Sequence, residues 1–150
     1  MTYPEAEVAA TITDRFVPVQ VNTQIEESKG VIERYHQAWT PDIRILAPDG
    51  SELYACQGYL PPFEFIPQLL TGEGTARFRL NDLAGAAACY DEVLRRFPTS
   101  AVAPEAMYFR AAARYKASHE PEDLLGGWRQ LQSRYPDSIW RQKQVFTEGE

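Results

Sequence analysis

The clearest alternation of apolar and polar positions in the chain begins at residue 42. Ile43 and Ile45 alternate with polar neighbours, which is the pattern of a strand with one buried face. Ala47-Pro48-Asp49-Gly50 follows, with a proline suited to the first central position of a turn and a glycine that can adopt a positive φ. The sequence therefore predicts a β-hairpin, with its first strand at 42–47 and a second strand after the turn.

The residues before this hairpin predict a helix and then a strand. A short helix is expected at 4–14, with Val8 and Ile12 on its buried face. β-branched residues at every second position predict a strand at 16–21. Pro18 lacks the backbone donor of a strand, which favours an edge position. The apolar positions of this strand are Val17, Val19 and Val21.

A second helix is predicted to lead into the hairpin. Thr23-Gln24-Ile25-Glu26 has the spacing of a capping box and should open a helix that continues to about Ala38. Thr40-Pro41 ends it, because a proline disfavours the helical conformation of the residue before it. Four residues at helical spacing form its apolar face, and we expect them in the core: Ile25, Ile32, Tyr35 and Trp39.

After the hairpin, Leu60-Pro61-Pro62 predicts the start of another helix. Pro67 favours a kink in it. Thr71-Gly72-Glu73-Gly74 is the most glycine-rich stretch, and we predict a boundary between two parts of the protein there. The apolar stripe of this helix is expected to consist of Phe63, Ile66, Leu69 and Leu70.

The C-terminal half of the sequence contains an imperfect internal repeat. Residues 90–100 align with residues 128–138 at an offset of 38, with aromatic, aliphatic, arginine and proline positions in common. A repeat of this length is typical of arrays of helical hairpins. We predict helices at 74–81, 83–97, 102–117 and 121–135, and a frayed tail from Ile139.

The order helix, Thr-Pro, strand, Pro-Asp-Gly turn, strand, Gly-Tyr, helix in residues 2–71 resembles the C-terminal half of the thioredoxin fold. The resemblance implies a cis Thr40-Pro41 bond, in a loop with which this family pairs extended peptides. The family's first strand and Cys-x-x-Cys motif are missing from the sequence, and Cys56 and Cys89 stand 33 residues apart. We interpret both cysteines as small buried residues.

The repeat resembles the tetratricopeptide repeat (TPR). Val93 and Leu131 depart from the family, which usually has alanine at these positions, and two copies are fewer than such arrays generally need to be stable alone. We therefore expect the repeats to share burial with the preceding part. The matching residues are Gly74, Ala86, Tyr90 and Pro98 in the first copy, and Ala112, Tyr115, Trp128 and Pro136 in the second.

These patterns predict an α/β protein, in which an incomplete thioredoxin-like α/β unit at 1–72 is followed by an all-α array of TPR-like helical hairpins at 73–150.

Hydrophobic residues make up 44% of the sequence and charged residues 24%, which are ordinary values for a globular protein. A net charge of -6 disfavours nucleic-acid binding, and apolar runs are too short to span a membrane. With no secretion signal after Met1, the sequence predicts a cytoplasmic location.

The chemistry-bearing residues predict a binding protein, because we find no catalytic, metal-binding or cofactor-binding motif. Without the family's first strand, the predicted strands at 16–21 and 42–47 either pair directly in a rearranged monomer or leave open edges. An open edge would accept an extended peptide or a second copy in a homodimer. The alternative function is a thiol-disulfide oxidoreductase whose redox-active N-terminal segment is missing from this chain.

Two surfaces are candidates for binding a protein or peptide. Aromatic and arginine side chains dominate binding energy at protein interfaces. In the repeats, such a groove would contain Tyr108, Arg110, Arg114, Tyr115 and Trp128, although residues like Tyr115 and Trp128 more often pack between helices. The second candidate surface, by analogy with the thioredoxin-like peptide-binding loop, consists of Trp39, Thr40 and Pro41.

Overall fold

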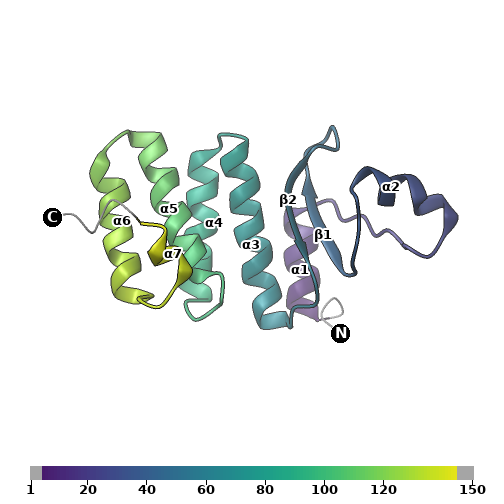
Figure 1. Ribbon diagram of the computed structural model, residues 1–150, viewed down its shortest axis with the longest axis horizontal. Helices are drawn as coiled ribbons and strands as arrows, with labels where there is room; N and C mark the ends of the chain where they lie inside the picture. The colour runs from purple at the N-terminus through teal and green to yellow at the C-terminus, as the bar shows by residue number, and fades with distance from the viewer. Residues whose placement is uncertain (1–4, 145–150) are drawn as a thin grey trace.

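The computed structural model describes residues 5–144, which form a mixed but mostly helical protein with a small antiparallel sheet (Figure 1). Helices α3 to α6 stand side by side in a row, with the hairpin and α1 at one end of it (Figure 1). In chain order the elements are α1 (Ala6–Arg15), the 3₁₀ helix η1 (Glu26–Ser28), α2 (Lys29–Arg34), β1 (Asp42–Leu46), β2 (Glu52–Gln57), α3 (Pro62–Arg79), α4 (Leu83–Arg96), α5 (Ala103–Ser118), α6 (Pro121–Arg134) and α7 (Ile139–Gln142).

The predicted hairpin is confirmed. β1 and β2 pair antiparallel, with Ile43 opposite Cys56 and Ile45 opposite Tyr54. Gly50 closes the turn: its N–H donates across the turn at 2.8 Å, and its φ of 82° lies in the region that glycine adopts without steric cost. The local turn chemistry was therefore sufficient to place both strands.

A single helix, α3, runs through the predicted boundary at 71–74, so the separate helix predicted at 74–81 is wrong. The glycines have a different role. A methyl group added at Gly72 would lie 2.6 Å from the Tyr54 ring, and one added at Gly74 would lie 2.6 Å from the Tyr90 ring. Both residues thus let neighbouring elements approach α3 closely, the hairpin from one side and α4 from the other.

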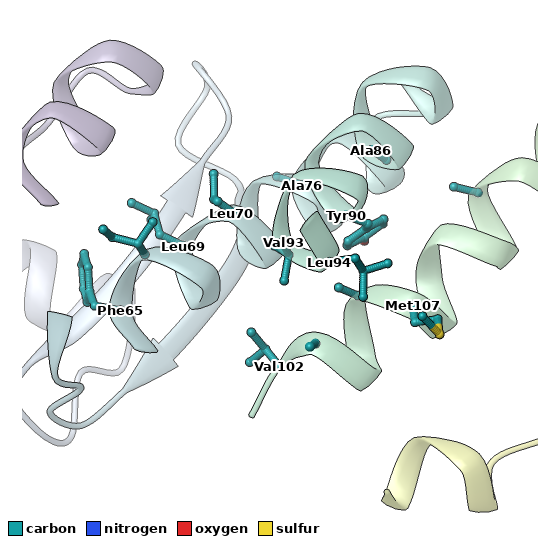
Figure 2. Close-up of a cluster of buried hydrophobic side chains, with 14 of the residues drawn as sticks. Phe65, Leu69, Leu70, Ala76, Ala86, Tyr90, Val93, Leu94, Val102 and Met107 are labelled. Atoms are coloured by element: carbon teal, nitrogen blue, oxygen red, sulfur yellow. The ribbon is translucent and has the colours of Figure 1, made fainter. Parts of the chain in front are cut away.

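The hydrophobic core is continuous along the row of helices. One cluster of buried side chains includes Val8 of α1, Ile45 of β1 and Leu131 of α6. Figure 2 shows its middle part, where side chains of α3, α4 and α5 face one another, among them Tyr90 and Met107, which are fully buried. The hairpin and the C-terminal helices therefore share a core.

The apolar stripe predicted for α3 is only partly right. Ile66, Leu69 and Leu70 are buried, but Phe63 is 69% exposed and Phe65 is buried instead. Because α3 is covered by the hairpin on one side and by α4 on the other, its buried surface is wider than a single stripe.

Helices α4, α5 and α6 confirm the predictions at 83–97, 102–117 and 121–135 to within one residue at each end. The tail expected to fray from Ile139 instead forms α7. Its Trp140 ring lies 5.3 Å, between centroids, from the ring of Tyr108 and also from that of Phe109. The last six residues of that tail, 145–150, lie outside the described residues.

The segment 17–41, here called the arm, differs most from the sequence-based prediction. Helix α1 confirms the helix expected at 4–14, but no strand forms at 16–21. A strand needs a neighbour to satisfy its backbone groups, and the sheet contains only β1 and β2 among the described residues. The helix predicted up to Ala38 is reduced to η1 and α2, and Asn22, not Thr23, caps the local turn through the Gln24 N–H.

Ion pairs attach α1 to the row of helices. The Arg15 guanidinium donates to the Glu73 carboxylate of α3 at 2.7 Å and also contacts Glu92 of α4. Arg77 donates to the other oxygen of Glu73 at 2.9 Å. The Glu73 side chain is only 9% exposed, so its charge is stabilised by these two partners.

None of the helices between residues 5 and 144 has the length and apolar content needed to cross a bilayer.

Candidate interaction site

Two of the aromatic residues predicted for a groove in the repeats, Tyr108 and Trp128, pack against each other between helices. The Tyr108 and Trp128 rings are stacked, with centroids 5.1 Å apart and an angle of 19° between their planes. Trp128 is 6% exposed. These two residues therefore hold α5 and α6 together, which for Trp128 is the packing role that the sequence left open.

The predicted arginines occupy the other side of α5. Arg110 donates to Asp91 of α4 at 3.0 Å and to Gln130 of α6 at 3.0 Å. Arg114 donates to the second carboxylate oxygen of Asp91 at 3.1 Å. By helical spacing, Arg110 and Arg114 lie on a different face of α5 from Tyr108 and Tyr115. Tyr115 is partly exposed. The five residues of the predicted groove thus do not share one surface.

The loop predicted as the second surface is accessible. Trp39 is 67% exposed, Thr40 is exposed, and the Thr40–Pro41 bond is cis, as the sequence resemblance implied. The Gln37 side-chain amide donates to the Trp39 carbonyl at 2.7 Å, which fixes the backbone of the loop. The indole ring is left available for contact with another molecule.

The first part of the arm is also exposed, and sequence reasoning missed it as a binding element. Val17 and Val19 are 92% and 82% exposed. Among the described residues, no backbone–backbone hydrogen bond involves the segment from Val17 to Val21. The signal was present in the sequence, because the alternating valines were identified, but they were assigned to a paired strand.

The returning limb of the arm is anchored to the hairpin. The Tyr35 hydroxyl donates to the Gly50 carbonyl at 2.8 Å, and the Arg44 guanidinium lies 5.5 Å from the Tyr35 ring centroid. These contacts hold the returning limb of the arm against the hairpin turn. The remainder of the arm extends away from the row of helices (Figure 1).

Neither cysteine has the properties of a nucleophile. Burial raises the pKa of the Cys89 thiol to about 11, and the nearby Glu73 carboxylate acts in the same direction. Burial also raises the pKa of Cys56. A reactive thiol needs the opposite shift, so the oxidoreductase alternative gains no support from these residues. Residues 5–144 bring together no cluster of His, Cys, Asp or Glu able to hold a metal ion.

No family model, curated protein or solved structure matches the chain. The assignment of a function therefore rests on three features of the structure: the exposed arm, the edge of the hairpin, and the side of α5 that carries Arg110 and Arg114.

Proposed function

We propose that this protein is a non-catalytic protein-interaction module, in which an incomplete thioredoxin-like unit is joined to TPR-like helices. The observation that carries the proposal is the arm, which exposes apolar side chains on a protein whose other elements share a continuous core. When exposed apolar side chains gather on one segment, they mark an interaction site. The exposed apolar residues of the arm are Val17, Val19, Val21, Ile25, Val31 and Trp39.

The thioredoxin-like part of this proposal is supported by the order of elements around the hairpin. Helix α2, the cis Thr40–Pro41 bond, β1, β2 and α3 follow one another in the order that the resemblance implies. The TPR-like part is supported by the four consecutive helices α3 to α6, each of which packs against the next.

The binding mode that fits these features is the addition of a strand. The Gly58 N–H donates to the Pro41 carbonyl at 2.9 Å, so in this antiparallel register the backbone groups of Ile43 and Ile45 face β2. Those of Asp42 and Arg44 face away from it. They form an open edge, because β1 pairs with no other strand among residues 5–144.

The arm supplies a second stretch able to pair with a strand. From Val17 to Val21 its backbone has no regular secondary structure and makes no backbone hydrogen bond with the described residues. Because Pro18 has no N–H, we expect an added strand to form its hydrogen bonds with the backbone groups of Val17 and Val19. An extended peptide with alternating apolar residues would satisfy these backbone groups and cover the exposed valines. We therefore propose such a peptide as the partner, supplied by another protein or by a second copy of this chain.

Selection from a displayed library of random peptides of about ten residues tests this function. We expect enrichment of peptides with alternating apolar residues. Changing Val17→Lys and Val19→Lys together should weaken their binding by at least about tenfold, because the lysines cannot be covered by an apolar strand. Leu80→Lys is the matched control, since Leu80 is an exposed apolar residue at the end of α3, remote in sequence from the arm.

Selected peptides that bind both variants equally well, or a failure to enrich any sequence pattern, would contradict the proposal. Light scattering on the same samples identifies the form of the partner. If a second copy is the partner, the wild-type protein has twice the 17.0 kDa mass of the chain and the double-lysine variant has the mass of one chain.

A further inference from the structure

The groove between α4 and α6 is a surface that the strand-addition function does not use. Both helices pack against α5 and they do not pack against each other, so α5 forms the floor of the groove. A hollow of about 600 Å³ lies there. Its lining includes side chains from all three helices: Ala88, Asp91, Glu92, Leu94, Arg95, Arg110 and Arg134.

The first hollow carries unpaired positive charge, although the net charge of the protein is -6. Arg95 and Arg134 have no carboxylate partner among the described residues, and the Arg134 guanidinium lies 5.6 Å from the Tyr135 ring centroid. The acidic Glu92 is already neutralised by Arg15 and Arg96. The hollow therefore has more cationic than free anionic groups.

One of the protein's own carboxylates, that of Asp91, is bound by arginines in the groove. One oxygen of Asp91 accepts from Arg110 at 3.0 Å and the other accepts from Arg114 at 3.1 Å. Arg110 is held in place by its second bond to Gln130, and its side chain is only 13% exposed. Two guanidinium groups from one helix face thus converge on a single carboxylate.

Beyond Arg110 lies a second hollow of about 230 Å³, whose lining combines Arg110 and Arg114 with the carboxylates of Glu122 and Asp123. This second hollow has no excess of positive charge, so the site is confined to the first hollow. There Arg95 and Arg134 come from different helices, α4 and α6. Two separate guanidinium groups suit a peptide that carries several carboxylates better than a single small anion, because each can bind a separate acidic group.

From this geometry we propose that the groove binds an acidic, extended peptide segment, with Arg95, Arg110 and Arg134 as its anchors. In the absence of that peptide, Asp91 occupies part of the site as an internal competitor. The complementary charge identifies the class of partner, and this site is independent of the arm.

Fluorescence anisotropy with a fluorescein-labelled peptide of about eight alternating glutamate and serine residues tests the proposal at low salt. Arg95→Gln combined with Arg134→Gln should weaken binding by about tenfold or more. Asp91→Asn should strengthen it several-fold, because the internal carboxylate no longer competes. The matched control combines Arg79→Gln with Arg141→Gln, which removes the same charge from exposed positions outside the groove.

Circular dichroism on each variant establishes that it is folded. Equal loss of affinity in the two double variants would overturn the proposal, since binding would then follow net charge alone. An absence of binding by the wild-type protein, or weaker binding by the Asp91→Asn variant, would also overturn it. A single-stranded DNA of the same charge that binds more tightly than the peptide would contradict the assignment of the partner class.

Discussion

Replacing Gly74 by alanine is expected to destabilise the protein by about 1–3 kcal/mol, although alanine is the better helix former by about 1 kcal/mol. The added methyl group would lie 2.6 Å from one ring carbon of Tyr90 and 2.9 Å from another. Tyr90 is completely buried and its ring stacks on that of Phe109, so it has no free space into which to move. Urea unfolding followed by circular dichroism measures the effect.

Two further variants separate this overpacking from other causes. Gly30→Ala in α2 is the control, because no atom lies within 4 Å of the added methyl group; it should be neutral or stabilise by up to about 1 kcal/mol. Tyr90→Leu should partly relieve the collision, so that the cost of Gly74→Ala is smaller in that background. A Gly74→Ala protein as stable as wild type would show that the close approach of α3 and α4 is incorrect.

Arg15→Met is expected to cost about 2 kcal/mol of unfolding free energy, because it leaves the buried Glu73 carboxylate with one cationic partner instead of two. Arg15 donates to Glu73 at 2.7 Å and also contacts Glu92, so its loss weakens the attachment of α1 to both α3 and α4. The methionine keeps the apolar stem of the side chain, and the comparison therefore isolates the charge.

Arg129→Met is the matched control for this ion pair. Arg129 contacts Glu122, but both side chains are more than half exposed. Exposed pairs contribute about 0–1 kcal/mol, so the control should change stability little. If the two substitutions had the same effect in guanidinium unfolding, the cluster around Glu73 would contribute no more than an ordinary surface ion pair.

The parts of the fold that the sequence predicted correctly are those determined by local interactions. The hairpin follows from a turn sequence and from alternation at Ile43 and Ile45, and α4 to α6 follow from helical periodicity with recognisable ends. The strand at 16–21 failed because alternating valines specify a strand only when another strand lies beside them. That condition is set by the tertiary structure and does not appear in the local pattern.

The glycines of α3 illustrate a second limit. A glycine can mark a flexible link or a close approach, and the sequence alone does not distinguish these. Only the positions of Tyr54 and Tyr90, on opposite sides of α3, show that Gly72 and Gly74 are close-approach residues.

The candidate site shows the same limit in its side chains. Helical spacing identified aromatic and arginine residues on α5, but their roles depend on partners from other helices. Trp128, 20 residues away, buries Tyr108 by stacking, whereas Asp91, 19 residues away, holds Arg110 at the groove. In the arm the alternating valines were visible in the sequence, but their exposure was not, because it results from the absence of a neighbouring strand among the described residues.

Amide hydrogen exchange on the isolated protein, repeated with a selected apolar peptide, tests the central claim most directly. We predict slow exchange at Gly72 and Gly74, through the middle of one continuous helix, and exchange at Val17, Val19 and Val21 as fast as in an unfolded chain. The peptide should protect these valine amides. Slow exchange at the valines in the isolated monomer, or fast exchange at the two glycines, would contradict the account of a shared core with an unpaired, partner-binding arm.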